Sequence, residues 1–433
     1  MAGMTAGSGW SNRTRGSGAG TIGNFTEWYD FAVFGASATV LAAVFTSGGT
    51  DALTEVFAVF GASFILRPVG ALVVGHRADA LGRRGPLLWM IVLMSAATTA
   101  IGLLPTYAAV GAAALVPLLL LRGVQGFSSG GEFVTSITYV VELAPPAHRG
   151  RWGGAHMATL SLGFAAGIGT VAGLLQVIGR QSMESWGWRL PFLVALPLGA
   201  VGLYMRLRTD ESPEFVGSSP SPRNLATLRH ELWGHRTTLV CGFLLTAAFT
   251  SSFNLWFVYL PSAMVAQHNS SLSTALECAL GGMLALAGSA VMCGHLSDRR
   301  GRRPVLLAGA ASLAIVWTVG PPLATSGSVA ALAATYLAAG LAIGGLVLQS
   351  ALSDLLPVRG RATGLAISVG FGSAMVGGTS PFIAQSLPGT STWPVQAYAL
   401  VWVALAAGSV ARWMRVSDVP FSPTVPLRPS EGA

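Results

Sequence analysis

Long apolar runs separated by short polar loops dominate this chain. Most runs reach about 20 residues, the length that a helix needs to cross about 30 Å of hydrocarbon. The pattern therefore predicts an all-α membrane protein whose twelve transmembrane helices lie at approximately 22–46, 54–76, 86–105, 110–139, 150–178, 188–207, 237–265, 272–296, 304–323, 327–352, 361–387 and 394–414.

Composition argues against a soluble enzyme. Only 10% of the 433 residues are charged, whereas a soluble domain carries about a quarter. The three cysteines, Cys241, Cys278 and Cys293, lie in or beside apolar runs, which indicates packing residues and neither a disulfide framework nor a metal site. The sequence contains no G-x-x-x-x-G-K-[ST] loop, so an ATP-driven pump is not expected.

The basic residues, all 25 of them arginine, lie mostly on one side of the predicted spans. Arg67 and Arg122 fall inside spans, Arg180 and Arg189 fall on the second side, and every other arginine falls in the tails and loops of the first side. The positive-inside rule places that side and both termini in the cytoplasm. Because topology explains the net charge of +8, we expect no nucleic-acid partner.

One long polar connection divides the spans into two groups of six. It covers residues 208–236 and includes three prolines and several charges. We therefore expect two pseudo-symmetric six-helix bundles and the following domains: a cytoplasmic tail at 1–21, the first bundle at 22–207, the linker at 208–236, the second bundle at 237–415 and a cytoplasmic tail at 416–433.

The two groups repeat the same loops. After the second and eighth spans, 219 residues apart, Gly75, Asp79, Gly82, Arg83 and Arg84 correspond to Gly294, Asp298, Gly301, Arg302 and Arg303. After the fourth and tenth spans, 212 residues apart, Glu142 and Arg149 correspond to Asp354 and Arg361. Internal repeats of this kind are typical of alternating-access transporters.

At these loops the sequence resembles the major facilitator superfamily, whose hallmark is G-x-x-x-D-x-x-G-R-[RK]. Ala80 departs from this pattern, because a basic residue is usual there. The first half more narrowly resembles the metabolite:proton symporter family, in residues 23–33, 64–70, 122–132, 187–192 and 210–215. The resemblance implies the major facilitator fold and a non-enzymatic, proton-driven importer of di- and tricarboxylates, shikimate-like acids, proline or betaine.

The resemblance also implies that the repeated loops form a gate. In the superfamily the aspartate of this motif faces the N-terminus of a helix in the other half, where exposed N–H groups and the helix dipole favour an anion. We expect Asp79 and Asp298 to hold the inner gate closed, with nearby arginines bridging to Glu142, Asp354 and lipid phosphates. A purely topological role of the arginines would not explain the repeated aspartates and glycines.

Ionisable residues inside spans indicate function, because they are costly in a membrane. A rise of about 1.5 Å per residue places Asp30, Arg67, Arg122 and His156 at one level. We expect Asp30 and Arg122 to pair, since a carboxylate stays ionised beside an arginine and takes up a proton when the arginine moves away. In related sugar symporters of the superfamily a similar aspartate is the proton site, which supports this role for Asp30. The alternative is that Asp30 and Arg122 form a static ion pair that only fixes helix packing.

The other charged residues of the first half leave alternatives open. Glu27 is either a second proton acceptor or inner-gate residue, or an interfacial carboxylate. Glu132 is rotated by about 80° from the face of the span-four arginine, which favours an interfacial role. Arg67 is either structural or a weak substrate-site candidate, and His156, which replaces a glutamine common in the family, is either a core histidine or such a candidate.

The second half has no ionisable residue deep in a span, so we assign proton coupling to the first half. Asn254, Tyr259 and Gln349 are its weak candidates for substrate binding. We expect a monomer in the cell membrane, with lipids and a small-molecule substrate as partners, the proton as coupling ion, and neither cofactor nor metal. The leading hypothesis is symport of an organic acid or zwitterion; the alternatives are a proton-antiport exporter of a drug-like or biosynthetic product and a non-transporting sensor.

Overall fold

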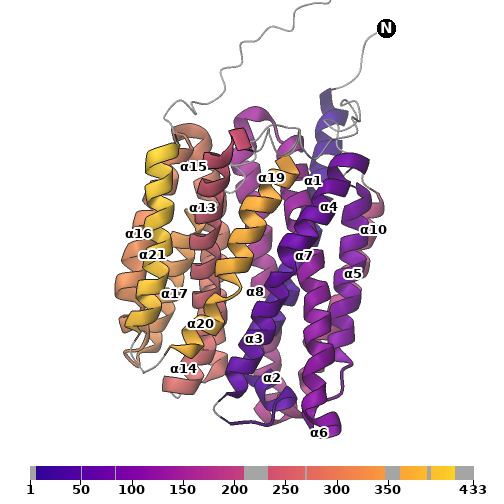
Figure 1. Cartoon of the computed structure of the whole chain (residues 1–433), viewed down its shortest axis with the longest axis vertical. Helices are drawn as coiled ribbons and strands as arrows, with labels where there is room; N and C mark the ends of the chain where they lie inside the picture. The colour runs from indigo at the N-terminus through magenta and orange to yellow at the C-terminus, as the bar shows by residue number, and fades with distance from the viewer. Residues whose placement is uncertain are drawn as a thin grey trace, which may run out of the picture.

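Apolar helices run side by side along the long axis of the protein (Figure 1). The computed structural model describes residues 6–49, 51–82, 84–208, 233–268, 271–346, 361–387 and 392–414. Within these ranges the side chains of 6–20, 79, 80, 146, 267, 268, 361 and 362 lie outside the description. The described part contains no strand.

The helices of the first half include breaks at Ser37, Leu66 and Val194, each within a predicted span. They are α1 (Ala6–Ala36), α2 (Ala38–Phe45), α3 (Ala52–Ile65), α4 (Arg67–Leu81), α5 (Arg84–Gly102), α6 (Tyr107–Val110), η1 (Gly111–Ala114), α7 (Leu115–Leu143), η2 (Pro146–His148), α8 (Arg149–Ser182), η3 (Met183–Gly187), α9 (Arg189–Leu193) and α10 (Ala195–Leu207).

The helices of the second half include three short π-helical segments. They are α13 (Arg236–Asn254), η4 (Leu255–Tyr259), α14 (Leu260–His268), α15 (Leu272–Arg300), α16 (Arg302–Ala324), α17 (Val329–Gly344), α19 (Arg361–Leu365), η5 (Ala366–Gly370), η6 (Ser373–Gly377), α20 (Ser380–Ser386) and α21 (Trp393–Trp413), of which η4, η5 and η6 are the π-helical ones.

These helices confirm the predicted fold class. Ten described helical spans are long and apolar enough to cross a membrane, and the bent pair α1–α2 makes an eleventh. That pair bends by 64° at Ser37, where the sequence predicts a continuous span. The shorter apolar α17 falls in the predicted span 327–352, whose residues after 346 lie outside the description. The domain boundaries remain a prediction, because most of the linker is not described.

The closest packing between the halves joins α8 to α15. A Cβ atom at Gly154 would lie 2.4 Å from the carbonyl oxygen of Ala290, and one at Gly294 would lie 2.4 Å from that of Gly150. Small residues here bring the two backbones into direct contact, as they do in many membrane helix pairs. This contact between α8 and α15, which we call the glycine seam, lies at the end of the bundle where α5, α8 and α16 begin. We call that end the arginine-rich end, because it contains Arg84, Arg149, Arg151, Arg302 and Arg303.

The halves also touch at the opposite end of the bundle. The Phe57 ring of α3 lies 6.2 Å from the Tyr259 ring of η4, measured between centroids. A Cβ atom at Gly61 would lie 3.0 Å from the carbonyl oxygen of Gly378. Between these ends the halves also meet through the ring of Phe253 in α13, whose centroid lies 5.3 Å from that of Trp28 and 4.9 Å from that of Phe164.

Candidate functional site

The two copies of the repeated loop end their helices in the same way. Gly82 (φ +100°) and Gly301 (φ +87°) adopt left-handed backbones, which glycine reaches without strain. The Gly82 N–H donates to the Ala78 carbonyl at 3.2 Å, and the Gly301 N–H donates to the Ser297 carbonyl at 3.1 Å. Both glycines therefore cap a helix C-terminus and turn the chain into the next helix.

The last arginine of each copy ties two helices of its own half together. Arg84 Nη2 donates to the Leu207 carbonyl at 2.9 Å, and Arg303 Nη2 donates to the Ala411 carbonyl at 2.7 Å. Both carbonyls lie at the C-terminal ends of helices, α10 and α21, where a cation is favoured by the helix dipole. These arginines thus connect helices within one half, and the expected bridges to acidic residues and lipid remain a prediction.

Asp298 crosses from the second half to the first. Its Oδ1 accepts the Gly150 N–H and its Oδ2 accepts the Arg151 N–H, each at 2.8 Å. Arg302 Nη1 lies 2.7 Å from Asp298 Oδ1 and donates to the Ser297 hydroxyl at 2.8 Å. The carboxylate therefore sits at the N-terminus of α8 in the other half, which is the arrangement that the resemblance implied for this motif.

The first copy is described only in part. Gly75 is buried in α4, and α4 packs against α19, the helix that begins at Arg361. The side chains of Asp79 and Arg361, and all of Arg83, Gln349 and Asp354, lie outside the described residues. Glu142 is buried at the end of α7, and Arg149 begins α8. The gating predictions for these residues remain predictions.

Glu27 of α1, Arg67 of α4 and Ser129 of α7 meet inside the first half. Arg67 Nη2 lies 2.7 Å from Glu27 Oε1 and also donates to the Ser129 hydroxyl, which in turn donates to Glu27. Glu27 is 1% exposed and Arg67 is 4% exposed, so Glu27 is not an interfacial carboxylate. Removing one partner of such a buried pair typically costs about 3–5 kcal/mol, because the other charge is left unpaired.

Asp30 and Arg122 belong to one network but form no direct ion pair. Arg122 Nη1 donates to Gln125 Oε1 at 2.9 Å, and Gln125 Nε2 donates to the Thr98 hydroxyl at 2.6 Å. The Thr98 hydroxyl donates to Asp30 Oδ2 at 2.7 Å. The expected pairing thus takes the form of a relay in which two neutral side chains join the carboxylate to the guanidinium.

Aromatic rings enclose the Arg122 guanidinium. Its central carbon lies 4.2 Å from the ring centroid of Phe34, 4.9 Å from that of Phe31 and 5.4 Å from that of Phe60. Arg122 Nη2 also donates to the Ser63 hydroxyl at 3.2 Å. Cation–π contacts of this kind offset part of the cost of burying the charge.

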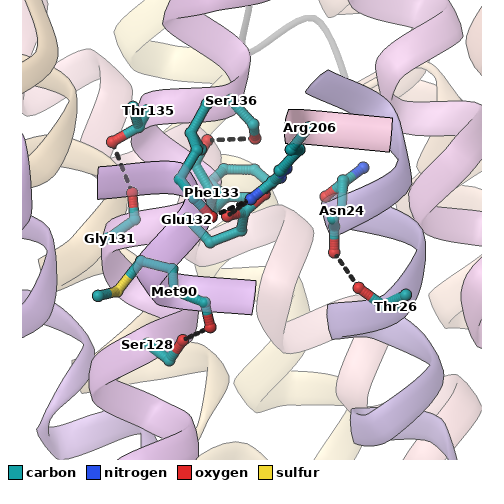
Figure 2. A network of polar contacts seen from close by, with 12 residues as sticks. Asn24, Thr26, Met90, Ser128, Gly131, Glu132, Phe133, Thr135, Ser136 and Arg206 are labelled. Carbon is teal, nitrogen blue, oxygen red and sulfur yellow. Dashed lines mark hydrogen bonds and ion pairs between the residues drawn. The ribbon is translucent and has the colours of Figure 1, made fainter. Parts of the chain in front are cut away.

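Glu132 forms a third buried contact between opposite charges. Figure 2 shows its carboxylate facing the Arg206 guanidinium, and Arg206 Nη1 donates to Glu132 Oε2 at 2.8 Å. Arg206 also donates to the Leu87 carbonyl. Because Glu132 is 4% exposed and Arg206 2%, the expectation of an interfacial Glu132 is wrong.

One side of α7 carries a member of each of these three networks. Arg122, Gln125, Ser129 and Glu132 follow at intervals of three, four and three residues, which keeps them on one broad face of a helix. The other charged residues of the three networks lie on neighbouring helices: Asp30 and Glu27 on α1, Arg67 on α4 and Arg206 on α10.

A central cavity lies between the halves, beside the Glu27–Arg67 pair. Its side-chain lining comes from α1, α4 and α7 of the first half and from α13, η5 and η6 of the second half: Trp28, Arg67, Ser129, Phe133, Val134, Thr246, Phe249, Thr250, Val369 and Ser373. Arg67 is the charged residue among them. A cation thus borders a space that both halves enclose.

A larger cavity lies within the second half. Trp256, Tyr259 and Trp317 are in its wall, and none of the described residues that line it is charged. We regard the central cavity as the better candidate despite its smaller size, because it adjoins the buried charges and touches both halves. Tyr259 therefore faces a different cavity from Arg67.

The remaining substrate candidates are buried and hydrogen-bonded. His156 Nε2 lies 3.1 Å from the Ser136 hydroxyl, and its ring contacts Phe133. Asn254 Nδ2 donates to the Gly377 carbonyl at 2.8 Å. Neither residue lines the central cavity, so the structure favours a packing role for both.

The major facilitator superfamily model matches residues 20–378. The chain belongs to this superfamily. An ectoine/proline transporter of Corynebacterium glutamicum is 34% identical over 389 residues, which cover 84% of this chain and 76% of the relative. A proline/betaine transporter of Escherichia coli is 32% identical over 408 residues, which cover 89% of this chain and 80% of the relative.

A solved proton:xylose symporter, bound to 6-bromo-6-deoxy-D-glucose, shares the fold of this major facilitator protein. Its TM-score is 0.76 at 19% identity, over 93% of this chain and 95% of the solved one. The relatives are named as transporters, and the described helices supply ten to eleven apolar spans. The protein is therefore a multi-pass membrane transporter and not an enzyme.

Sequence reasoning missed Thr98, Gln125, Ser129 and Arg206. The helical spacing from Arg122 was a usable signal for Gln125 and Ser129, since residues three and seven positions later lie on the same face. Arg206 was counted only as a topology signal at the end of a span. Nothing in the local sequence distinguishes Thr98 from the hydroxyl residues beside it, because its role arises from helices packed far apart in sequence.

Proposed function

We propose that this protein is a proton-coupled symporter that takes up a small zwitterion or organic acid by alternating access. The observation that carries the proposal is the buried Glu27–Arg67 pair at the wall of the central cavity. A guanidinium there suits a substrate carboxylate, which it binds through charge-assisted hydrogen bonds. Glu27 forms an ion pair with Arg67 in this structure, and protonation of Glu27 would break that pair and leave Arg67 available to the substrate carboxylate.

Charge balance supports coupling between the proton and the substrate. The buried networks contain the guanidinium groups of Arg67, Arg122 and Arg206 and the carboxylates of Glu27, Asp30 and Glu132. A proton or a substrate carboxylate bound alone leaves one unbalanced charge in a buried site, at a cost of several kcal/mol. Bound together, the proton and the carboxylate of an organic monoanion leave none, so its loaded and empty states are favoured over the half-loaded ones. A zwitterion also brings a cationic group, which the aromatic rings of the cavity would stabilise.

Asp30 is the proton site that we propose beside Glu27. It is 2% exposed, and the relay through Thr98 and Gln125 connects it to Arg122. A displacement of Arg122 during the transport cycle would therefore reach the carboxylate through these two side chains. This assignment keeps proton coupling in the first half.

Aromatic rings favour a zwitterion as the substrate. Trp28, Phe133 and Phe249 line the central cavity together with Arg67. Ring faces attract ammonium groups by about 0.5–2 kcal/mol each, and they also accept apolar substituents on the nitrogen. The relatives are named as transporters of proline, betaine and ectoine, which supports extending this substrate class to the present chain.

The arginine-rich end is the cytoplasmic end in this proposal, in accordance with the positive-inside rule. The contact between Asp298 and the N-terminus of α8 holds this end closed, and the close packing of α8 against α15 at the glycine seam also holds it closed. When the site opens to the cytoplasm, these contacts separate. By symmetry, Asp79 performs the same task toward α19.

Uptake into proteoliposomes of the purified protein tests the proposal. An acidic exterior should drive accumulation of radiolabelled proline or glycine betaine, a protonophore should abolish it, and protein-free liposomes should show none. Unlabelled di- and tricarboxylates and shikimate, added as competitors, separate organic acids from zwitterions. If none of these compounds accumulates under the gradient, the proposal is wrong.

The reversed gradient separates symport from export by antiport. An antiporter would accumulate substrate in proteoliposomes with an acidic interior, whereas we expect accumulation only with an acidic exterior. A non-transporting sensor would bind the substrate and accumulate it under neither gradient.

A further inference from the structure

The Thr98 hydroxyl lies among three polar groups in the first half. It is 2.7 Å from Asp30 Oδ2, 3.0 Å from the Met94 carbonyl oxygen and 2.6 Å from Gln125 Nε2. Thr98 and Gln125 are fully buried, and Asp30 is 2% exposed. Loss of any one of these hydrogen bonds is therefore costly in free energy, because it leaves a buried polar group without a partner.

The direction of each hydrogen bond follows from the chemistry of the groups. Arg122 is only a donor, so the Gln125 amide must turn its oxygen toward Arg122 and its NH₂ group toward Thr98. The Thr98 oxygen thus accepts one hydrogen bond from Gln125. Its single proton is left for either the Asp30 carboxylate or the Met94 carbonyl.

Both protonation states of Asp30 fit this arrangement. An ionised Asp30 only accepts, so the Thr98 proton points toward it. A protonated Asp30 donates to the Thr98 oxygen, which has a second lone pair, and the Thr98 proton turns to Met94. The change requires rotation of one hydroxyl bond and no displacement of a heavy atom.

We infer that Thr98 is a positioning residue that satisfies Asp30 in both its ionised and its protonated form. The inference rests on the proposed function in taking Asp30 as a proton site. Thr98 also connects the proton to the rest of the site, because the amide that bonds to it holds Arg122. Loss of the hydroxyl should therefore change the pH at which Asp30 binds its proton.

The charged surroundings of Asp30 are few. Arg122 of α7 and Glu27 of α1 act on it electrostatically, and Tyr29 is its neighbour in the chain. Among the described residues, the other elements packed against α1, namely α2, α5, α8, α9, α10 and η4, direct no charged side chain at Asp30. A change confined to Thr98 thus alters one hydrogen bond and leaves these charges in place.

Three variants isolate the hydroxyl. Thr98→Val removes it at nearly constant size, and Thr98→Ser retains it. Thr99→Val is the matched control, because the Thr99 hydroxyl donates only to the Ser95 carbonyl of its own helix, at 2.8 Å. Thermal unfolding of the purified proteins verifies that each variant folds, and Thr98→Ala replaces Thr98→Val if valine is not accommodated.

The direct readout is infrared titration of the protonated carboxyl band that Asp30→Asn removes. Thr98→Val takes a charge-assisted hydrogen bond from the ionised carboxylate and a weaker, neutral one from the protonated carboxyl, so Asp30 should keep its proton to a pH higher by about one unit. Thr98→Ser and Thr99→Val should titrate like the wild type. Equal titration of Thr98→Val and Thr99→Val would overturn the inference, and so would a shift in Thr99→Val.

Transport gives a second, independent readout. In proteoliposomes, the pH profile of acid-driven uptake should shift upward in Thr98→Val, while substrate counterflow persists. Loss of counterflow in a folded Thr98→Val protein would indicate a structural role and would overturn the inference. Absence of acid-driven uptake in the wild type would instead refute the proposed function, and the infrared titration would still decide the role of Thr98.

Discussion

Asp298 Oδ1 lies 2.8 Å from the backbone nitrogen of Gly150, which belongs to the other half of the protein. A second hydrogen bond of the same length joins Asp298 Oδ2 to Arg151 N. Hydrogen bonds to a charged group contribute about 1.5–3 kcal/mol each. Two of them are strong enough to favour the closed arginine-rich end and weak enough to be broken in each transport cycle.

Replacing Asp298 should weaken the contact with α8 that holds the arginine-rich end closed. We expect Asp298→Ala to reduce uptake at least about tenfold, because a loss of about 1.4 kcal/mol already changes a conformational equilibrium by that factor. Membrane abundance should not change. Initial uptake rates, normalised to protein level, measure the effect.

Arg299 provides the control, because it follows Asp298 in the last turn of α15 and is exposed. Arg299→Ala should keep uptake near that of the wild type. Wild-type uptake in Asp298→Ala would show that the contact with α8 is dispensable.

The glycine seam makes a second prediction. Leucine at Gly154 should prevent close approach of α8 and α15, since even its Cβ atom would lie 2.4 Å from the Ala290 carbonyl oxygen. We expect Gly154→Leu to bind substrate but to lose at least about nine tenths of its uptake, because the closed end is needed before the site opens outward. Calorimetric binding and proteoliposome uptake measure the two properties.

Gly173 is the matched position on the same helix, because no atom lies within 4 Å of a Cβ atom built there. Gly173→Leu should transport normally. Equal uptake by the two leucine variants would contradict the proposed role of the seam.

The sequence sufficed for the fold, but not for the partners of the buried charges. Apolar length and loop arginines predict the spans, because both follow directly from the membrane. Depth places Asp30 and Arg122 at one level, yet depth carries no information on the side chains between them. Thr98 and Gln125 therefore became visible only in the packed helices.

Glu132 shows a different limit. The conclusion drawn from its expected angle on α7 relative to Arg122 was wrong. The estimate ignored the reach of a long guanidinium side chain from a neighbouring helix. Arg206 extends from the last turn of α10 to meet Glu132, so a residue turned away from one arginine is paired with another.

The Glu27–Arg67 pair predicts a stability pattern. Glu27→Ala should destabilise the protein by about 3–5 kcal/mol, because it leaves a buried guanidinium unpaired. The double variant Glu27→Gln with Arg67→Gln removes both charges and should recover most of that loss. Denaturation of the purified proteins in detergent measures the difference.

Transport by the same variants separates stability from function. The double variant should fold and yet fail to accumulate substrate, because the carboxylate-binding group is gone. Acid-driven accumulation by the double variant would contradict the assignment of Arg67 to the substrate.

Proton coupling through Asp30 is tested most directly by comparing accumulation with counterflow in Asp30→Asn. Asparagine approximates the protonated carboxyl in size and polarity but cannot release a proton. The account predicts that Asp30→Asn proteoliposomes exchange labelled for unlabelled substrate at rates near the wild type, and that an acidic exterior drives no accumulation. Full acid-driven accumulation by Asp30→Asn would contradict it.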